Sequence, residues 1–189
     1  ADFVIISIAV KRMELWEQDY RVALSFGIPH VYGENGGPAA LFHALRNYEI
    51  ILPICRDMER LCPDAWLMNF TNPEARILTA ILKLTKLKAF GLCHGFHSLQ
   101  HTASRLLGRP VADLDIRSAG MNHLYTYVKI ADRKTGEDLL PLFERKVRDN
   151  LGTFDAFTRH LFEAYGVLGY ASEDHTGEYV GYAHEFMPL

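Results

Sequence analysis

Two hydrophobic patterns alternate along the first 108 residues of the chain. Short apolar, β-branched runs predict buried strands over residues 3–10, 65–70 and 87–93. Between these runs, apolar residues recur at helical spacing and predict helices over residues 12–26, 39–62, 75–86 and 97–107. This alternation of strands and helices predicts an α/β fold with a doubly wound parallel sheet.

Two segments interrupt the alternation. Pro53 falls inside the helical pattern 39–62, where it predicts a kink or a break between two helices. The glycine-rich stretch 33–38, GENGGP, lacks the G-x-G-x-x-G order of a dinucleotide-binding turn and does not directly follow a strand. We interpret it as a flexible loop that crosses over a pocket.

The pattern changes after Gly108-Arg109-Pro110. Residues 115–123 and 124–139 alternate like antiparallel strands, with a turn at Lys134-Thr135-Gly136. Leu139 to His160 is charged and helical, and residues 165–182 are rich in Gly, Tyr and acids, as in a loop and short helix that line a site. We expect two regions, an α/β region over 1–108 and an α+β region over 109–189.

Composition excludes several classes of protein. The 20 Lys and Arg residues are mixed with 23 Asp and Glu residues, so the chain has no basic stripe for nucleic acid. No apolar run reaches the roughly 18 residues of a membrane helix. The three cysteines favour a reducing compartment, and we expect a cytoplasmic protein. Because the chain opens inside a strand pattern without Met, we also expect a fragment of something longer.

Two polar motifs fall where ligands bind in a parallel sheet, beyond the carboxyl ends of the strands. NFTNP, with Asn69 and Asn72, follows the second predicted strand, and CHG, which begins at Cys93, follows the third. Capping of the helix after Pro73 is an equally good interpretation of the two asparagines. Cys93 precedes a helix, a position that favours the thiolate, so it is a candidate nucleophile or metal ligand. An inert cysteine beside a capping His94 is the alternative.

Two further polar clusters have both a structural and a functional interpretation. His97 and His101 share one helix face at i, i+4, but no glutamate of an H-E-x-x-H motif accompanies them, so we interpret them as a solvated or substrate-facing stripe. Residues 173–179 hold three acids and a histidine. They form either a solvated loop or, given the Tyr and Gly residues around them, part of a site.

Taken together, these segments resemble glycoside hydrolase family 4, the NAD- and metal-dependent glycosidases built on a malate-dehydrogenase-like scaffold. The matching pieces follow the family's order and spacing over about residues 1–129: ADFVIISI, YGENGGPAALFHALRN, CPDAWLMNFTNPEA, AFGLCHG and GMNHLY. The resemblance implies two domains: the last part of a Rossmann-like NAD-binding domain, with its parallel sheet, over 1–108, and the start of an α+β substrate domain over 109–189. It also implies the hydrolysis of α-glycosides of the galactoside or glucoside type.

The resemblance implies a metal site and a sugar site. Cys93 and His123 match the two protein ligands of a divalent metal, usually Mn²⁺. Asn72 and Asn122 match residues around the sugar, and Ser7 and Asn69 would border the bound NAD.

The implied mechanism oxidises sugar C3 with NAD⁺, removes the C2 proton, and eliminates the leaving group at C1, which distinguishes it from ordinary two-carboxylate glycosidases. His94 would donate a proton to the departing oxygen, because an imidazole titrates near neutral pH. Glu173, Asp174 and Tyr170 are candidates for the C2 base, with Asp174 or its neighbour preferred.

Departures from the family pattern lead to further expectations. The family's first βαβ unit, which binds the pyrophosphate, would precede residue 1, so we expect the chain alone to bind NAD poorly and to be inactive. Trp16 stands near the place of a phosphate-binding arginine, which favours an unphosphorylated small-molecule glycoside. We expect the full-length protein to be a homo-oligomer, a dimer or a tetramer.

Two other functions share parts of this pattern. A 2-hydroxyacid dehydrogenase uses the same scaffold, but it needs an arginine clamp and an Asp-His relay where this chain has Cys93 and His123. A non-catalytic, truncated sugar- or metal-binding fragment shares every motif.

Overall fold

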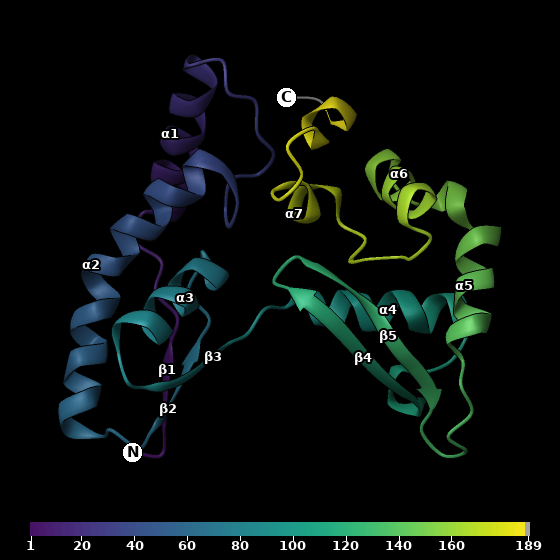
Figure 1. Ribbon diagram of the computed structural model, residues 1–189, viewed down its shortest axis with the longest axis horizontal. Helices are drawn as coiled ribbons and strands as arrows, with labels where there is room; N and C mark the ends of the chain where they lie inside the picture. The colour runs from purple at the N-terminus through teal and green to yellow at the C-terminus, as the bar shows by residue number, and fades with distance from the viewer. Residues whose placement is uncertain (188–189) are drawn as a thin grey trace. The chain divides into compact units, whose positions relative to one another are not determined.

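The computed structural model describes residues 1–187, and the chain divides into two compact units, Ala1–Cys93 and His94–Leu189 (Figure 1). The first unit is a parallel sheet with helices and the second is a hairpin with helices, so the predicted α/β class and the α+β region that follows it are confirmed. The predicted boundary at residue 108 concerns the NAD-binding and substrate domains, and it stays a prediction.

The first unit is built on three parallel strands in the order β1 (Phe3–Ile6), β2 (Trp66–Asn69) and β3 (Lys88–Gly91). Its helices are α1 (Arg12–Ser25), α2 (Gly37–Leu61) and α3 (Glu74–Leu84). The sheet, α2 and α3 share one apolar core, whose fully buried members include Leu67, Ile51, Ile77 and Ile81. Each strand lies within its predicted apolar run, and β1 occupies the first half of the run 3–10.

Helix α2 contains Pro53, where the cost of a proline inside a helix competes with the burial of the apolar residues around it. The helix runs unbroken from Gly37 to Leu61 with Pro53 inside it, so the predicted break is wrong. A proline inside a helix costs about 3 kcal/mol, but Ile51, Cys55 and Met58 around it are buried in the core. Their burial, at about 1.5–3 kcal/mol for each large side chain, outweighs the loss.

The second unit is a two-stranded antiparallel sheet with helices. Its elements are α4 (Gly95–Leu107), β4 (Leu114–Met121), β5 (Leu124–Asp132), α5 (Leu140–Asp149), α6 (Ala156–Tyr165) and α7 (Glu173–Gly177). Short 3-10 turns lie at Val111–Asp113, Leu151–Thr153 and Ala183–Phe186. Apolar residues of α4, both strands, α5 and α6 form its core, with Leu99, Ile130 and Phe143 almost fully buried.

The predicted turn at Lys134-Thr135-Gly136 is confirmed: it follows β5, where the Asp132 amide donates to the Glu137 carbonyl and Ala131 pairs with Asp138. The turn that joins β4 to β5 lies at Asn122-His123, where the two predicted strand segments meet. The charged helical stretch 139–160 contains two helices rather than one, because the Asp155 side chain accepts the Thr158 amide and begins α6. Among residues 1–187, no helix is both long and apolar enough to span a membrane.

Candidate functional site

The carboxyl ends of the three parallel strands lie in register. Asn69 pairs with Ile6 on one side and with Gly91 on the other. Short bonds extend this alignment past the strands: the Ile8 amide donates to Thr71 Oγ1 at 2.8 Å and the Leu92 amide to the Asn69 carbonyl at 2.9 Å. The segments after the strands, with Ser7, the NFTNP motif and Cys93, therefore start from one edge of the sheet, where ligands bind in this class of fold.

The two asparagines of NFTNP have different partners. Asn69 is fully buried, and its side chain bonds both backbone groups of Thr71, accepting at 3.0 Å and donating at 3.1 Å. Asn72 is half-buried and donates from Nδ2 to Glu34 Oε1 at 2.8 Å, while its carbonyl accepts from Asn47 at 2.7 Å. Neither asparagine caps α3, whose N-cap residue is Pro73.

The glycine-rich loop 33–38 supplies two buried polar side chains. Glu34 is 2% exposed, and its carboxylate accepts from Asn72 and from the Arg12 guanidinium. Asn35 is fully buried and accepts the Ala75 amide in the first turn of α3 at 3.3 Å. The loop was predicted to be a flexible crossing over a pocket; the structure shows that part-buried hydrogen bonds join it to Asn72 and to the start of α3.

The CHG motif lies where β3 leads into α4. Cys93 is half-buried, and exposed His94 is the N-cap residue of α4. The orphan amides of a helix start favour negative charge, which supports a thiolate at Cys93. His97 and His101 are both exposed, in agreement with the predicted solvated stripe.

His123 lies in the tight turn between β4 and β5, within the second unit. Its backbone is in the left-handed region, with φ at 63°, and it is 1% exposed. Nδ1 of its ring is 2.9 Å from Glu178 Oε1, and its carbonyl accepts from Thr176 Oγ1 at 3.0 Å. These two bonds tie the hairpin turn to α7 and the residue that follows it.

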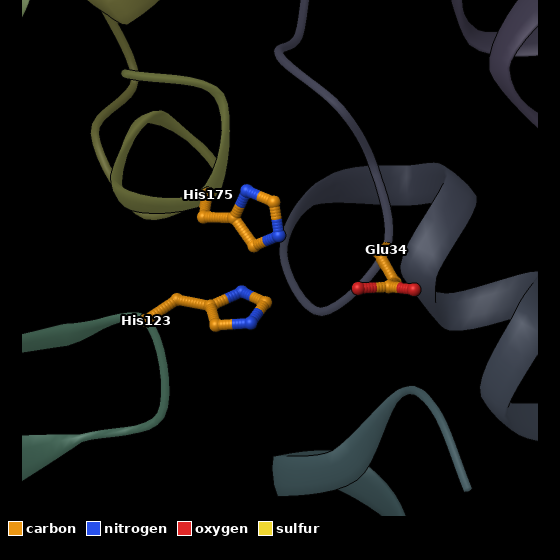
Figure 2. A group of neighbouring side chains, drawn as sticks. All are labelled: Glu34, His123 and His175. Carbon is orange, nitrogen blue, oxygen red and sulfur yellow. The ribbon is translucent and has the colours of Figure 1, made fainter. Parts of the chain in front are cut away.

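Helix α7 carries a second imidazole beside the first. The rings of His123 and His175 meet edge to face, with centroids 4.4 Å apart (Figure 2). His175 Nδ1 is 2.7 Å from Asp174 Oδ1, which also accepts from Ser172 Oγ at 2.6 Å. Figure 2 also draws Glu34, which belongs to the first unit.

The structure distinguishes the three candidate bases. Hydrogen bonds from His175 and Ser172 hold the pKa of Asp174 well below its ordinary value. Burial, followed by the nearby Asp155 and Asp174 carboxylates, raises the pKa of Glu173. The Tyr170 ring stacks on Tyr125 and has its centroid 6.2 Å from that of His123. Asp174 is therefore bound to His175, and all three residues remain predictions for the C2 base.

Asn122, next to His123 in the hairpin turn, has a buried acceptor. Its Oδ1 is inaccessible to solvent and has no hydrogen-bond partner anywhere in residues 1–187. A buried polar atom of this kind usually meets a water, an ion or a ligand. This observation suits the predicted contact between Asn122 and a sugar.

Sequence analysis did not single out Glu34, or the contacts that His175 and Glu178 make with His123. His175 and Glu178 lie in the segment that the sequence marked as dense in acids, but nothing local showed that they face His123. Glu34 lies between Gly33 and Asn35, and the glycine-rich loop around it was its local signal. Ser7 is exposed after β1, and its position next to the bound NAD stays a prediction.

The donor set of the second unit suits a divalent metal. Imidazole binds Mn²⁺, Zn²⁺ and similar ions, and histidine ligands are usually fixed by a carboxylate on the other ring nitrogen. His123 with Glu178 and His175 with Asp174 both have this arrangement.

Comparisons with known proteins identify relatives over most of the chain. Residues 1–109 match the model of the family 4 glycosyl hydrolases. The chain is 37% identical over 160 residues to the alpha-glucosidase of Erwinia rhapontici, covering 84% of this chain and 35% of that protein. It is 30% identical over 166 residues to the alpha-galactosidase of Bacillus subtilis (strain 168), covering 87% and 38%.

The fold also matches a solved enzyme. A 6-phospho-alpha-glucosidase from gut microorganisms, in complex with NAD and Mn²⁺, superposes with a TM-score of 0.78 at 22% identity, over 99% of this chain and 46% of that one. The predicted Rossmann-like scaffold is thereby confirmed. The chain spans well under half the length of these relatives, 35% and 38% of the two curated ones.

Proposed function

Because the chain belongs to glycosyl hydrolase family 4, we propose that the protein hydrolyses α-glycosides of the glucoside or galactoside type with NAD and a divalent metal, Mn²⁺ by preference. The observation that carries the proposal is the family match over residues 1–109, together with 37% identity to an alpha-glucosidase. When bound, NAD⁺ would supply a hydride acceptor for sugar C3, and the metal would supply a Lewis acid for the neighbouring oxygens.

Cys93 and His123 are the proposed protein ligands of the metal. Support comes from the resemblance of CHG and GMNH to the family motifs and from the chemistry of each position. Cys93 precedes a helix start, and His123 has Nδ1 committed to Glu178, so it would meet an ion through Nε2.

Asn72 and Asn122 are the proposed sugar contacts. Since Asn72 Nδ2 donates to buried Glu34, its Oδ1 is oriented to accept from a sugar hydroxyl. The buried Oδ1 of Asn122 would accept from another. Ser7 and Asn69 remain the proposed neighbours of NAD, with Asn69 acting through the turn that it holds at Thr71.

The proposed hydrolysis also needs two proton transfers, and side chains of this protein would carry out both. Exposed His94 is the proposed donor to the leaving group. For removal of the C2 proton we propose Tyr170, because its ring lies near His123 whereas Asp174 is bound to His175. Tyr170→Phe should abolish deuterium incorporation at C2 from heavy water, and incorporation at the wild-type rate would transfer the base role to Glu173.

The assay for the function follows p-nitrophenol release from α-glucosides and α-galactosides by the product of the complete reading frame. We expect release to require NAD⁺, Mn²⁺ and a reductant, and to be lost in Cys93→Ser. Cys62→Ser is the matched control, since Cys62 is also half-buried but lies outside the motif. Cleavage that persists without NAD⁺ or in Cys93→Ser would rule out this function. Accumulation of NADH with a 2-hydroxy acid would instead favour the dehydrogenase.

We propose an unphosphorylated sugar. Trp16 stands near the place of the family's phosphate-binding arginine, and its Nε1 donates to the Tyr32 carbonyl at 2.9 Å. The nearby Arg12 guanidinium pairs with Glu34 and lies 5.4 Å from the Trp16 ring. A higher kcat/KM for the 6-phosphorylated glycoside than for the plain one would show that the sugar phosphate is bound by other residues.

Two properties of the whole protein are also proposed. A homo-oligomer, dimer or tetramer, is testable by light scattering on the eluting protein. A cytoplasmic location is supported by the sparse, odd set of three cysteines, and fractionation of cells tests it.

A further inference from the structure

We propose that His175 is a second imidazole ligand of the divalent metal, alongside His123, so that the second unit alone supplies two nitrogen ligands. The inference rests on the proposed function for the identity of the metal. It adds a ligand that lies outside the Cys93–His123 pair.

Each of the two imidazoles is fixed through the same ring atom. His123 Nδ1 is 2.9 Å from Glu178 Oε1, and both side chains are almost completely buried. His175 Nδ1 is 2.7 Å from Asp174 Oδ1. A carboxylate at Nδ1 selects the tautomer in which Nδ1 carries the proton, and it makes Nε2 the more basic metal ligand.

The two rings are close enough to share one ion. Their centroids are 4.4 Å apart, and a ring nitrogen of each lies within 4.8 Å of one on the other. Two neighbouring nitrogens bound to one octahedral ion of the Mn²⁺ type stand roughly 3 Å apart. Binding of an ion would therefore bring the two nitrogens closer together than the 4.8 Å limit.

The backbone keeps the pair together. Thr176 Oγ1 donates to the His123 carbonyl at 3.0 Å and lies 2.9 Å from the Tyr170 carbonyl. Thr176 directly follows His175 in α7, so this hydroxyl fixes the helix against the hairpin turn. Both imidazoles are therefore carried by elements of one compact unit, and rigid elements position ligands better than free loops do.

A purely structural pair would have the same contacts but no affinity for metal. An Asp-His proton relay would also use Asp174 and His175, but its loss would reduce turnover rather than metal affinity. Direct measurement of metal binding therefore separates the three possibilities.

The experiment titrates the complete protein with Mn²⁺, without NAD⁺ or glycoside, and follows the free-ion signal by electron paramagnetic resonance. We expect His175→Gln and His123→Gln each to weaken Mn²⁺ binding at least tenfold. Asp174→Asn should weaken it about 10-fold or more, as loss of an outer partner does. His101→Gln is the control, because that exposed histidine on α4 should leave the affinity unchanged.

A second measurement needs no variant. In the wild-type protein, Mn²⁺ should broaden the imidazole resonances of His123 and His175 at concentrations that leave those of His101 sharp. Wild-type affinity in His175→Gln, or a sharp His175 signal with Mn²⁺ bound, would overturn the inference. Metal binding through both histidines without glycoside cleavage would instead refute only the proposed function.

Discussion

Gly120 lies at the end of the β4–β5 hairpin, two residues before the Asn122-His123 turn. Its φ is +140°, and a Cβ there would lie 2.3 Å from the Leu124 carbonyl oxygen and 2.5 Å from the Tyr125 Cα. Both atoms are backbone, so the paired strands would have to separate. A non-glycine residue at this φ would carry backbone strain of about 1–3 kcal/mol, and the clash of its Cβ with the partner strand would cost about 1–3 kcal/mol more. Gly120→Ala should therefore lower the free energy of unfolding by about 4 kcal/mol.

In a chain of this size, a loss of about 4 kcal/mol lowers Tm by about 8–16 °C. Circular dichroism during thermal and urea unfolding measures this loss. Two other glycines provide matched controls. Gly136 has a φ of +77° but nothing within 4 Å of an added Cβ, so Gly136→Ala should lose only about 1–2 kcal/mol from strain. Gly152 has neither feature, and Gly152→Ala should gain about 0.4–1 kcal/mol. If Gly120→Ala lost no more stability than Gly136→Ala, the close backbone approach would not be what requires glycine here.

Three further predictions concern the buried interior of the first unit. Burial, together with nearby arginines, lowers the pKa of His43 from 6.5 to about 4, so the folded state stays neutral while the unfolded chain gains a proton. The free energy of unfolding should therefore fall by about 3 kcal/mol between pH 6.5 and 4. Urea unfolding of His43→Leu should lack this part of the pH dependence, whereas the exposed-site control His97→Leu should keep it. Burial raises the pKa of Cys55 to about 11, so iodoacetamide at pH 8 should modify Cys62 and Cys93 in the folded protein and Cys55 only on unfolding, as seen by peptide mass mapping. Leu67→Ala, at a fully buried strand position, should cost about 2–5 kcal/mol in urea unfolding, and a cost below 1 kcal/mol would contradict its place in the core.

The strands and helices of this protein could be predicted because their signals are local. Alternating apolar runs and helical stripes depend on residues a few positions apart, and parallel strands bring their carboxyl ends to one edge. Local signals also located the turn at Lys134-Thr135-Gly136, but they did not single out Asn122-His123, the turn that joins β4 to β5. Distant partners hold it there, because Glu178 and Thr176 bond His123 across 55 and 53 positions of the chain.

By itself, the sequence determined the order of the elements, the unusual Cys-His-Gly and Gly-Met-Asn-His motifs, and through them the family. Only the tertiary structure decided which distant side chains form hydrogen bonds with the residues of these motifs and of the segment 173–179. It brought Glu34 to Asn72 from 38 positions away, and it brought the Asp174 carboxylate within 2.7 Å of the His175 ring. The physical reason is that the pKa, tautomer and hydrogen-bond partner of a buried group depend on what packing brings within about 3 Å. No periodic pattern along the chain encodes that distance.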